Sequence, residues 1–208
     1  RHWGFLYLPP LRFLAPLVTI WSMALLMFVY QRDLGSALLF FGMAVMMTYA
    51  ATSNKSYVFL AVVFFIISAF ISYLAFGHVR VRVAIWLNPW ADPMGQSYQI
   101  VQSLFALGYG GFFGTGFWQG SPDIIPAVYT DFIFSAIGEE FGSIGDFSVI
   151  MAYLLIFFRS VKIALLCQNE KYKLLSFGLA GTMLLQSFII LAGVTKLLPL
   201  TGITLPFI

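Results

Sequence analysis

Long apolar runs separated by short charged positions dominate the chain. A helix needs about 20 apolar residues to cross a bilayer. Four uncharged runs meet that length and predict membrane spans near residues 11–30, 34–52, 57–77 and 174–195. A fifth apolar stretch, 131–158, is long enough although it contains four acidic residues, and 203–208 has the pattern of the first turns of a further span.

The composition narrows the class of protein. Of the 208 residues, 61% are hydrophobic and 9% are charged, whereas a soluble domain carries about 25% charged residues. These values exclude a water-soluble globule and a disordered chain, and they predict an all-α, polytopic transmembrane helix bundle. The net charge of +3 is too small to indicate a nucleic-acid partner. One cysteine and two histidines exclude an internal disulfide and a histidine metal site.

Lysine and arginine in short loops predict the orientation, because these residues favour the cytoplasmic side of a membrane. A cytoplasmic N-terminal side places most of them inside, including Lys55 and the basic loop Arg159–Lys173. The segment 78–130 then forms one long, partly helical extracytoplasmic loop that is rich in aromatic residues. Because the chain starts without Met and stops inside an apolar run, we expect residues 1–208 to be part of a larger membrane domain.

Two parts of this external loop have distinct patterns. Gln96–Leu107 has helical periodicity and predicts a short helix at the outer membrane interface. Its Gln99, Gln102 and Ser103 share one face. Gly108–Gly120 is rich in glycine but lacks the spacing of a nucleotide-binding loop, so it predicts a close-packing turn at the membrane surface.

The apolar stretch that follows this loop opens with an acid. Thr130 suits a helix N-cap, and Asp131 in the first turn suits the helix dipole. Asp131 also begins a narrow stripe of small or polar residues, typical of a helix face that packs on other helices or lines a wet cavity. An acid within a membrane is costly and indicates a functional site. For Glu139 and Glu140 we favour structural pairing with helices outside the chain.

Four blocks of sequence resemble the SEDS family of membrane proteins (RodA, FtsW and SpoVE). They occur in the family's order and cover essentially the whole chain. The blocks are Arg32-Asp33-Leu34-Gly35-Ser36, with Arg where the family has Pro; Arg82–Trp86 with Asn88-Pro89-Trp90, Asp92-Pro93, Tyr98-Gln99 and Gln102-Ser103; Pro126 with Thr130–Phe134 and Gly138-Glu139-Glu140; and Gln186 with Pro199–Phe207. On this resemblance, residues 1–208 correspond to a partial SEDS transmembrane domain, from the fifth helix to the start of the tenth.

The resemblance implies a peptidoglycan glycosyltransferase in the bacterial cytoplasmic membrane. The family polymerises lipid II at the outer face, so the implied partners are lipid II, undecaprenyl-diphosphate-linked glycan, a class B penicillin-binding protein and membrane lipid. Asp131 matches the family's essential acid. Because the donor is α-linked and the product is β-1,4-linked, one inverting displacement suffices, with Asp131 as general base. The chain by itself is expected to be inactive.

The leaving diphosphate needs positive charge where its own charge develops. Arg80, Arg82 and Lys196 are the external cations near the outer helix ends. Arg82 is the first choice because it lies in a family block, and its alternative role is to anchor lipid headgroups. A divalent cation (Mg or Mn), held by Asp131 or by the lipid diphosphate, is another source of positive charge.

Several polar residues keep two interpretations. Gln99, Gln102 and Ser103 either bind sugar hydroxyls or satisfy their own helix. Asp123 is a candidate for regulation or acceptor positioning, and Asp33 suits the N-cap of the helix that starts at Leu34. Two other function classes stay open. One is a flippase that moves lipid II across the bilayer, and the other is a non-catalytic scaffold for the penicillin-binding protein.

Overall fold

The computed structural model describes residues 2–3, 6–7, 19, 22 and 33–207. The predicted span near 11–30 therefore lies almost entirely outside the described residues. The elements, in chain order, are β1 (His2–Trp3), β2 (Leu6–Tyr7), α2 (Leu34–Thr52), α3 (Lys55–Ala75), α4 (Gly77–Leu87), η1 (Pro89–Ala91), α5 (Tyr98–Gly110), η2 (Pro122–Ile124), α6 (Ile133–Leu166) and α7 (Glu170–Val194). The two short strands pair antiparallel.

Four of the described helices, α2, α3, α6 and α7, are long and apolar enough to cross a membrane. None of the residues of α3 is buried, and its outward side chains include Phe64, Phe70 and Ile66. Such a surface is stable against lipid and costly in water. The predicted all-α, polytopic membrane architecture is therefore confirmed.

Short polar caps decide where the apolar helices begin. The Asp33 side chain accepts a hydrogen bond from the Ser36 backbone N–H at 3.0 Å and starts α2, as predicted. In the same way, the Asn54 side chain accepts from the Ser56 N–H at the start of α3, and the Asn169 side chain accepts from the Lys171 N–H at the start of α7. Asp and Asn side chains satisfy backbone N–H groups that have no partner within the first helical turn. The helix bounds therefore follow from residues that sit between the apolar runs.

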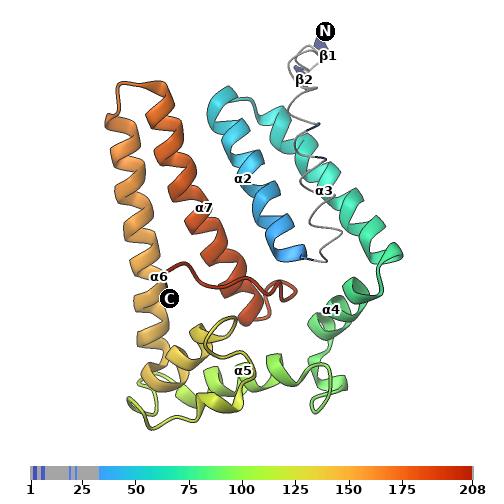
Figure 1. Cartoon of the computed structure of the whole chain (residues 1–208), viewed down its shortest axis with the longest axis vertical. Coiled ribbons are helices and arrows are strands. Elements are labelled where there is room, and N and C mark those ends of the chain that lie inside the picture. The colour runs from blue at the N-terminus through green and yellow to red at the C-terminus, as the bar shows by residue number, and fades with distance from the viewer. Residues whose placement is uncertain (1, 4–5, 8–18, 20–21, 23–32, 208) are drawn as a thin grey trace.

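The long helices pack side by side, with α7 between α6 and α2 and with α3 beside α2 (Figure 1). Small residues allow the close approach of α7 to α2: a Cβ at Gly178 would lie 2.8 Å from the sulfur of Met47, and Gly181 faces Met46. Small residues are typical of contacts between membrane helices. At one end of the bundle, α5 lies across the base and packs against α6 (Figure 1).

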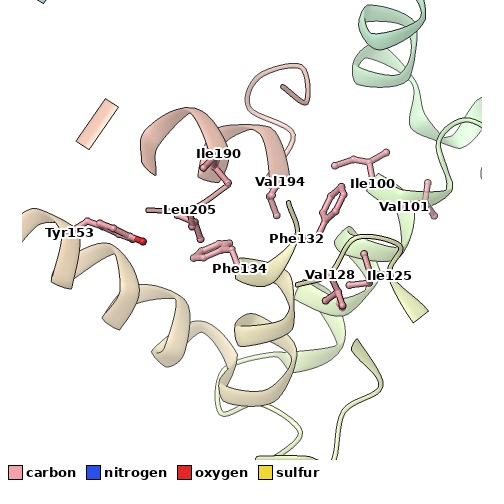
Figure 2. Packing of buried hydrophobic residues seen from close by; sticks show 11 residues of the cluster. Ile100, Val101, Ile125, Val128, Phe132, Phe134, Tyr153, Ile190, Val194 and Leu205 are labelled. Carbon is pink, nitrogen blue, oxygen red and sulfur yellow. The ribbon is translucent and has the colours of Figure 1, made fainter. Parts of the chain in front are cut away.

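The most buried cluster lies where α5, the start of α6, the end of α7 and the C-terminal segment meet (Figure 2). Phe132 is 0% exposed, and Val101 and Val194 pack in the same cluster. Burial of large apolar side chains there fixes the end of the bundle that carries most of the polar residues singled out in the sequence. The best-packed part of the molecule thus holds these polar residues in place.

The stretch predicted at 131–158 is a longer helix, 133–166, that is interrupted at Gly142. Gly142 has φ 68° and ψ −166°, which is outside the helical region. The glycine-rich loop fills the break: Thr115 N–H donates to the Glu139 carbonyl at 2.9 Å, and Ser143 N–H donates to the Gly111 carbonyl at 2.9 Å. A broken helix within a membrane is tolerated only where its backbone groups find such partners.

The loop can approach this closely because it lacks side chains at the contact. A Cβ at Gly114 would overlap the Glu140 carbonyl, and a Cβ at Gly110 would overlap the Gly138 carbonyl. The predicted close-packing turn is confirmed at Gly114, whereas residues 108–110 form the end of α5. The contact is with α6 of the same chain, which the glycine pattern did not indicate.

Residues 203–207 are not helical, although the apolar pattern predicted the first turns of a span there. Side chains from α4, α6 and α7 donate hydrogen bonds to backbone carbonyls between residues 200 and 206. Arg82 donates to the Leu200 and Thr201 carbonyls, Gln186 to the Thr204 carbonyl at 2.8 Å, and Tyr153 to the Pro206 carbonyl at 2.6 Å. The carbonyls of this non-helical stretch thus find partners on the long helices and on α4.

Candidate functional site

A cavity of about 200 Å³ opens where α4, α5, the segment before α6 and the turn after α7 converge. Its polar lining residues come from all four of these segments: Arg82, Trp86, Gln96, Gln99, Asp131 and Lys196. The structure therefore brings together residues that are more than one hundred positions apart in the sequence. Four of the predicted site residues, Arg82, Gln99, Asp131 and Lys196, line this one cavity.

Asp131 lies two residues before α6 and is half-buried. Its N–H donates to the Ala127 carbonyl at 3.1 Å, and the next residue, Phe132, is anchored in the core. Burial raises the pKa of the Asp131 carboxyl, while the neighbouring Thr130 side chain and the charge of Arg82 oppose that rise. The result is a rigidly placed acid whose charged form is disfavoured, as expected for a carboxyl in a partly dehydrated cavity.

The expected N-cap at Thr130 is wrong. Phe132 occupies the N-cap position without a side-chain hydrogen bond, and the Thr130 hydroxyl donates to the Ala127 carbonyl at 3.2 Å. Asp131 therefore precedes the helix instead of lying in its first turn. Its carboxylate is not consumed as a helix cap, which removes the ordinary structural role that the sequence had offered.

Arg82 reaches the cavity from α4. Its Nη1 donates to the Leu200 carbonyl at 3.1 Å and to the Thr201 carbonyl at 3.0 Å, so the guanidinium is held by backbone. A Cβ added to Gly202, at φ 75°, would lie 3.7 Å from Asp131 Oδ2 and 3.9 Å from Arg82 Nη2. Gly202 thus lies between the acid and the cation. Among the described residues, neither Asp131 nor Arg82 forms an ion pair within 4.0 Å.

Lys196 forms another wall just beyond α7. Its backbone has φ 63°, and its carbonyl accepts a hydrogen bond from the Trp86 indole N–H at 3.1 Å. Trp86 therefore ties α4 to the end of α7 and lines the cavity. Only the fold could indicate this role, because the two residues are 110 positions apart.

The remaining predicted substrate residues do not line this cavity. Arg80 is exposed on α4, and Asp123 is exposed and accepts a hydrogen bond from the Tyr129 hydroxyl, which raises the pKa of Tyr129. Gln102 lines a second cavity. Ser103 is fully buried, and its hydroxyl lies 2.7 Å from the hydroxyl of Ser135 on α6, so it joins two helices instead of facing a ligand.

Comparison with known proteins shows the family to which a chain with this cavity belongs. A family model described as "Cell cycle protein", FtsW/RodA/SpoVE, matches residues 8–208. The chain belongs to this family. The resemblance stated from the four sequence blocks is confirmed.

Relatives in several bacteria align along most or all of this family member. It is 42% identical over 207 residues to the peptidoglycan glycosyltransferase RodA of Mycobacterium bovis, an alignment that covers 100% of this chain and 44% of the relative. It is 36% identical over 196 residues to the probable peptidoglycan glycosyltransferase FtsW of Geobacter metallireducens, covering 93% of this chain and 52% of the relative. The chain thus spans about half the length of these relatives.

Two other acids of the family blocks have partners within this chain. Asp33, the α2 cap, is near enough to Arg82 to feel its charge. Burial raises the pKa of Asp33, but hydrogen bonds from Ser36 and Gly35 together with the Arg82 charge outweigh that effect and lower it. Glu139 is 6% exposed, and its Oε1 accepts from the Ser121 N–H at 2.8 Å. Within this chain Glu139 therefore binds loop backbone, and its pairing with helices outside the chain stays a prediction.

Glu140 is half-buried beside it on α6, and its backbone carbonyl accepts from the Gly116 N–H at 3.0 Å. That bond joins the helix break to the glycine-rich loop.

A bound metal in this family member would rely on few protein ligands. Within residues 33–207 and the other described positions, no three His, Cys, Asp or Glu residues cluster as a metal site. Mg²⁺ commonly binds through one or two carboxylates together with substrate phosphates. Asp131, half-buried and without an ion pair, fits that single-carboxylate mode, in which most ligands come from the diphosphate and water.

Proposed function

We propose that this protein is a peptidoglycan glycosyltransferase that polymerises lipid II, with Asp131 as the general base. The observation that carries the proposal is the cavity in which a half-buried, unpaired carboxylate faces Arg82 and Lys196. The relatives are named for the same reaction class. An acid whose pKa is perturbed, in a cavity with cations beside it, is the expected arrangement for acid–base catalysis on a phosphorylated substrate.

The proposed reaction is a single displacement. Asp131 takes the proton from the 4-hydroxyl of the acceptor sugar, and that oxygen attacks the anomeric carbon of the donor. The bond from this carbon to the diphosphate oxygen breaks on the opposite face, which converts an α linkage into a β linkage. The departing undecaprenyl diphosphate takes the electron pair, and the proton on Asp131 is released to it or to water.

The cations would act on the leaving group. Arg82 uses Nη1 to bind two carbonyls, and a guanidinium has five N–H donors, so it has further donors for diphosphate oxygens. Lys196 adds a second charge from another wall of the cavity. Donors that are already positioned stabilise developing negative charge without reorganisation at the moment of reaction. A divalent cation, when bound to the diphosphate, would supply additional positive charge at the same place.

The proposed orientation puts this cavity on the extracytoplasmic side and the basic loop between α6 and α7 in the cytoplasm. Two exposed positions can report this orientation: Gln119, in the glycine-rich loop before α6, and Gln168, in the loop between α6 and α7. Single cysteines there, in a Cys167→Ser background, would be treated with a membrane-impermeant maleimide on intact cells. We expect labelling at position 119 and protection at position 168, and the reverse pattern would contradict the orientation.

The activity is tested by polymerisation of lipid II in detergent with the purified full-length protein and its class B penicillin-binding protein. Asp131→Asn should abolish polymerisation and preserve folding and co-purification of the partner. Detergent has no two membrane sides, so a flippase would give no polymer there in either form. A non-catalytic scaffold would behave in the same way with and without the Asp131→Asn substitution. Polymer formed by Asp131→Asn at the unsubstituted rate would refute the proposed role.

A further inference from the structure

A second cavity, of about 590 Å³, lies beside the C-terminal half of α5 and is not used by the proposed chemistry. Residues of α5, the loop around Gly120, the region of η2 and Glu139 near the start of α6 line it. Its volume is within the range of roughly 300–1,000 Å³ that is typical of small-molecule sites. We propose that this cavity binds the glycan strand as a sugar subsite beside the reacting centre, a role that rests on the proposed glycosyltransferase function.

The polar lining fits uncharged sugar hydroxyl and acetamido groups. Glu139 supplies a carboxylate, and Gln102 and Gln119 supply amides that can both donate and accept. Tyr109 and Phe105 supply exposed aromatic surface for the apolar face of a sugar ring. No lysine, arginine or histidine is among the lining residues, so a phosphate would find no cation here. The chemistry therefore selects neutral sugar over diphosphate.

The carboxylate of Glu139 is held in a defined place. Its Oε1 accepts from the Ser121 N–H, and a Cβ at Gly120 would lie 3.0 Å from the same oxygen, so the loop lies directly on the acid. This bond uses one lone pair of one oxygen, and a carboxylate has about four acceptor positions. The remaining positions can accept from sugar hydroxyls, and hydrogen bonds to a charged acceptor are stronger than neutral ones.

Residues of the same helix, α5, line both cavities. Gln99 lines the first cavity and Gln102 lines the second. They are three residues apart on one helix, which is about 4.5 Å along its axis at 1.5 Å per residue. We infer that a glycan strand with one end beside Asp131 follows α5 toward the second cavity. Binding there would keep the growing strand attached between successive additions.

The experiment measures binding of two probes to the full-length protein by calorimetry. The first probe is chitotetraose, a neutral β-1,4-linked tetramer of N-acetylglucosamine, and the second is inorganic pyrophosphate with Mg²⁺. Glu139→Gln keeps an acceptor for Ser121 and removes the charge, while Gln119→Ala removes an exposed side chain whose loss leaves the core intact. The matched control is Glu140→Gln, which changes the neighbouring acid that does not line the cavity.

We expect Glu139→Gln and Gln119→Ala each to weaken chitotetraose binding about tenfold, a change of about 1.4 kcal/mol, with pyrophosphate binding unchanged. Both should also shorten the glycan chains made from lipid II, measured on gels. Glu140→Gln should change neither readout. Equal chitotetraose affinity in all variants, or an equal loss of both probes, would overturn the inference.

Asp131→Asn separates this inference from the proposed function. That variant should lose bond formation and retain chitotetraose binding, so a failure of the chemistry and a failure of the subsite give different results. If Asp131→Asn also lost chitotetraose binding as strongly as Glu139→Gln, the second cavity would not be an independent subsite, and the inference would be wrong.

Discussion

The two cavities along α5 hold acids of opposite character. Asp131 precedes α6, is half-buried, and faces Arg82 and Lys196 across the first cavity without forming an ion pair. Glu139 lies eight residues later, is nearly fully buried, and is bonded to the Ser121 N–H in a cavity whose lining contains no cation. An acid available to take a proton suits catalysis, whereas an acid already bonded to a loop suits positioning and recognition. The surroundings, more than the residue type, separate the two roles.

The cations show the same contrast. In the first cavity Arg82 is anchored through Nη1 on two backbone carbonyls, so its charge is fixed in place. In the second cavity amides and aromatic rings take the place of cations. A charged substrate would therefore bind with its diphosphate at the first cavity and its neutral sugars at the second. The following substitutions test this division, from the largest expected effect to the smallest.

Asp131→Asn has the largest expected effect. Loss of a general base lowers rates by 10²–10⁴-fold, so lipid II polymerisation should fall by about 10³-fold or more. The measurement is the rate of polymer formation by the full-length protein with its partner. The control is Glu170→Gln, an exposed acid at the start of α7 far along the helix from the cavity, which should retain the full rate.

Arg82→Gln tests the cationic wall. The change removes a fixed charge and two bonds to the C-terminal segment, and loss of one donor to developing negative charge typically costs 10²–10³-fold in rate. We expect a fall of about 10²-fold in kcat/KM. Arg82→Lys retains the charge but lacks the planar guanidinium, so its kcat/KM should lie between those of the unsubstituted protein and Arg82→Gln. Full activity in Arg82→Gln would assign Arg82 to a headgroup anchor.

Gly110→Ala tests the contact that holds α5 between the two cavities. A Cβ there would overlap the Gly138 carbonyl of α6, and overpacking of this kind costs about 1–3 kcal/mol. The matched control is Gly108→Ala on the same helix, where nothing lies within 4 Å of the added Cβ. We expect a lower thermal midpoint for Gly110→Ala alone. Equal midpoints would show that α5 does not depend on this close approach.

The pH dependence of the rate has the smallest expected effect. The raised pKa of Asp131 predicts an activity limb that rises with pH as the carboxyl ionises, above its ordinary value of 3.8. Removing the Arg82 charge would raise that pKa further, so the limb of Arg82→Gln should lie at higher pH. A flat rate profile between about pH 4 and 8 would contradict Asp131 as the base.

The raised pKa of Asp131 also determines how the stability of the fold changes with pH. Because the Asp131 pKa is higher in the folded protein than the ordinary value of 3.8, its contribution to stability is complete below that value. The contribution is lost as pH rises through the folded pKa. Asp131→Asn should therefore weaken the fall of the thermal midpoint with rising pH in this window.

Much of the architecture could be predicted from local sequence because its cause is local. Apolar length between charges indicated the membrane helices, and Asp33 before an apolar run indicated the start of α2. The family blocks predicted Asp131 and Arg82, and the cavity contains both. The placement of Ser103 could not be predicted, because a polar residue at a helical spacing pairs equally well with a ligand or with Ser135 on another helix.

By itself, the sequence of this protein determined the membrane class, the family and the identity of the candidate acid. These depend on composition, on helix-length runs and on residues that are close together in the chain. The tertiary structure decided which groups meet: Arg82 contacts a carbonyl 119 residues away, and Glu139 binds a loop that had no apparent connection to it. The break at Gly142 and the non-helical course of residues 203–207 have the same cause. Distant backbone and side-chain groups supply hydrogen bonds that a continuous helix would otherwise have made for itself.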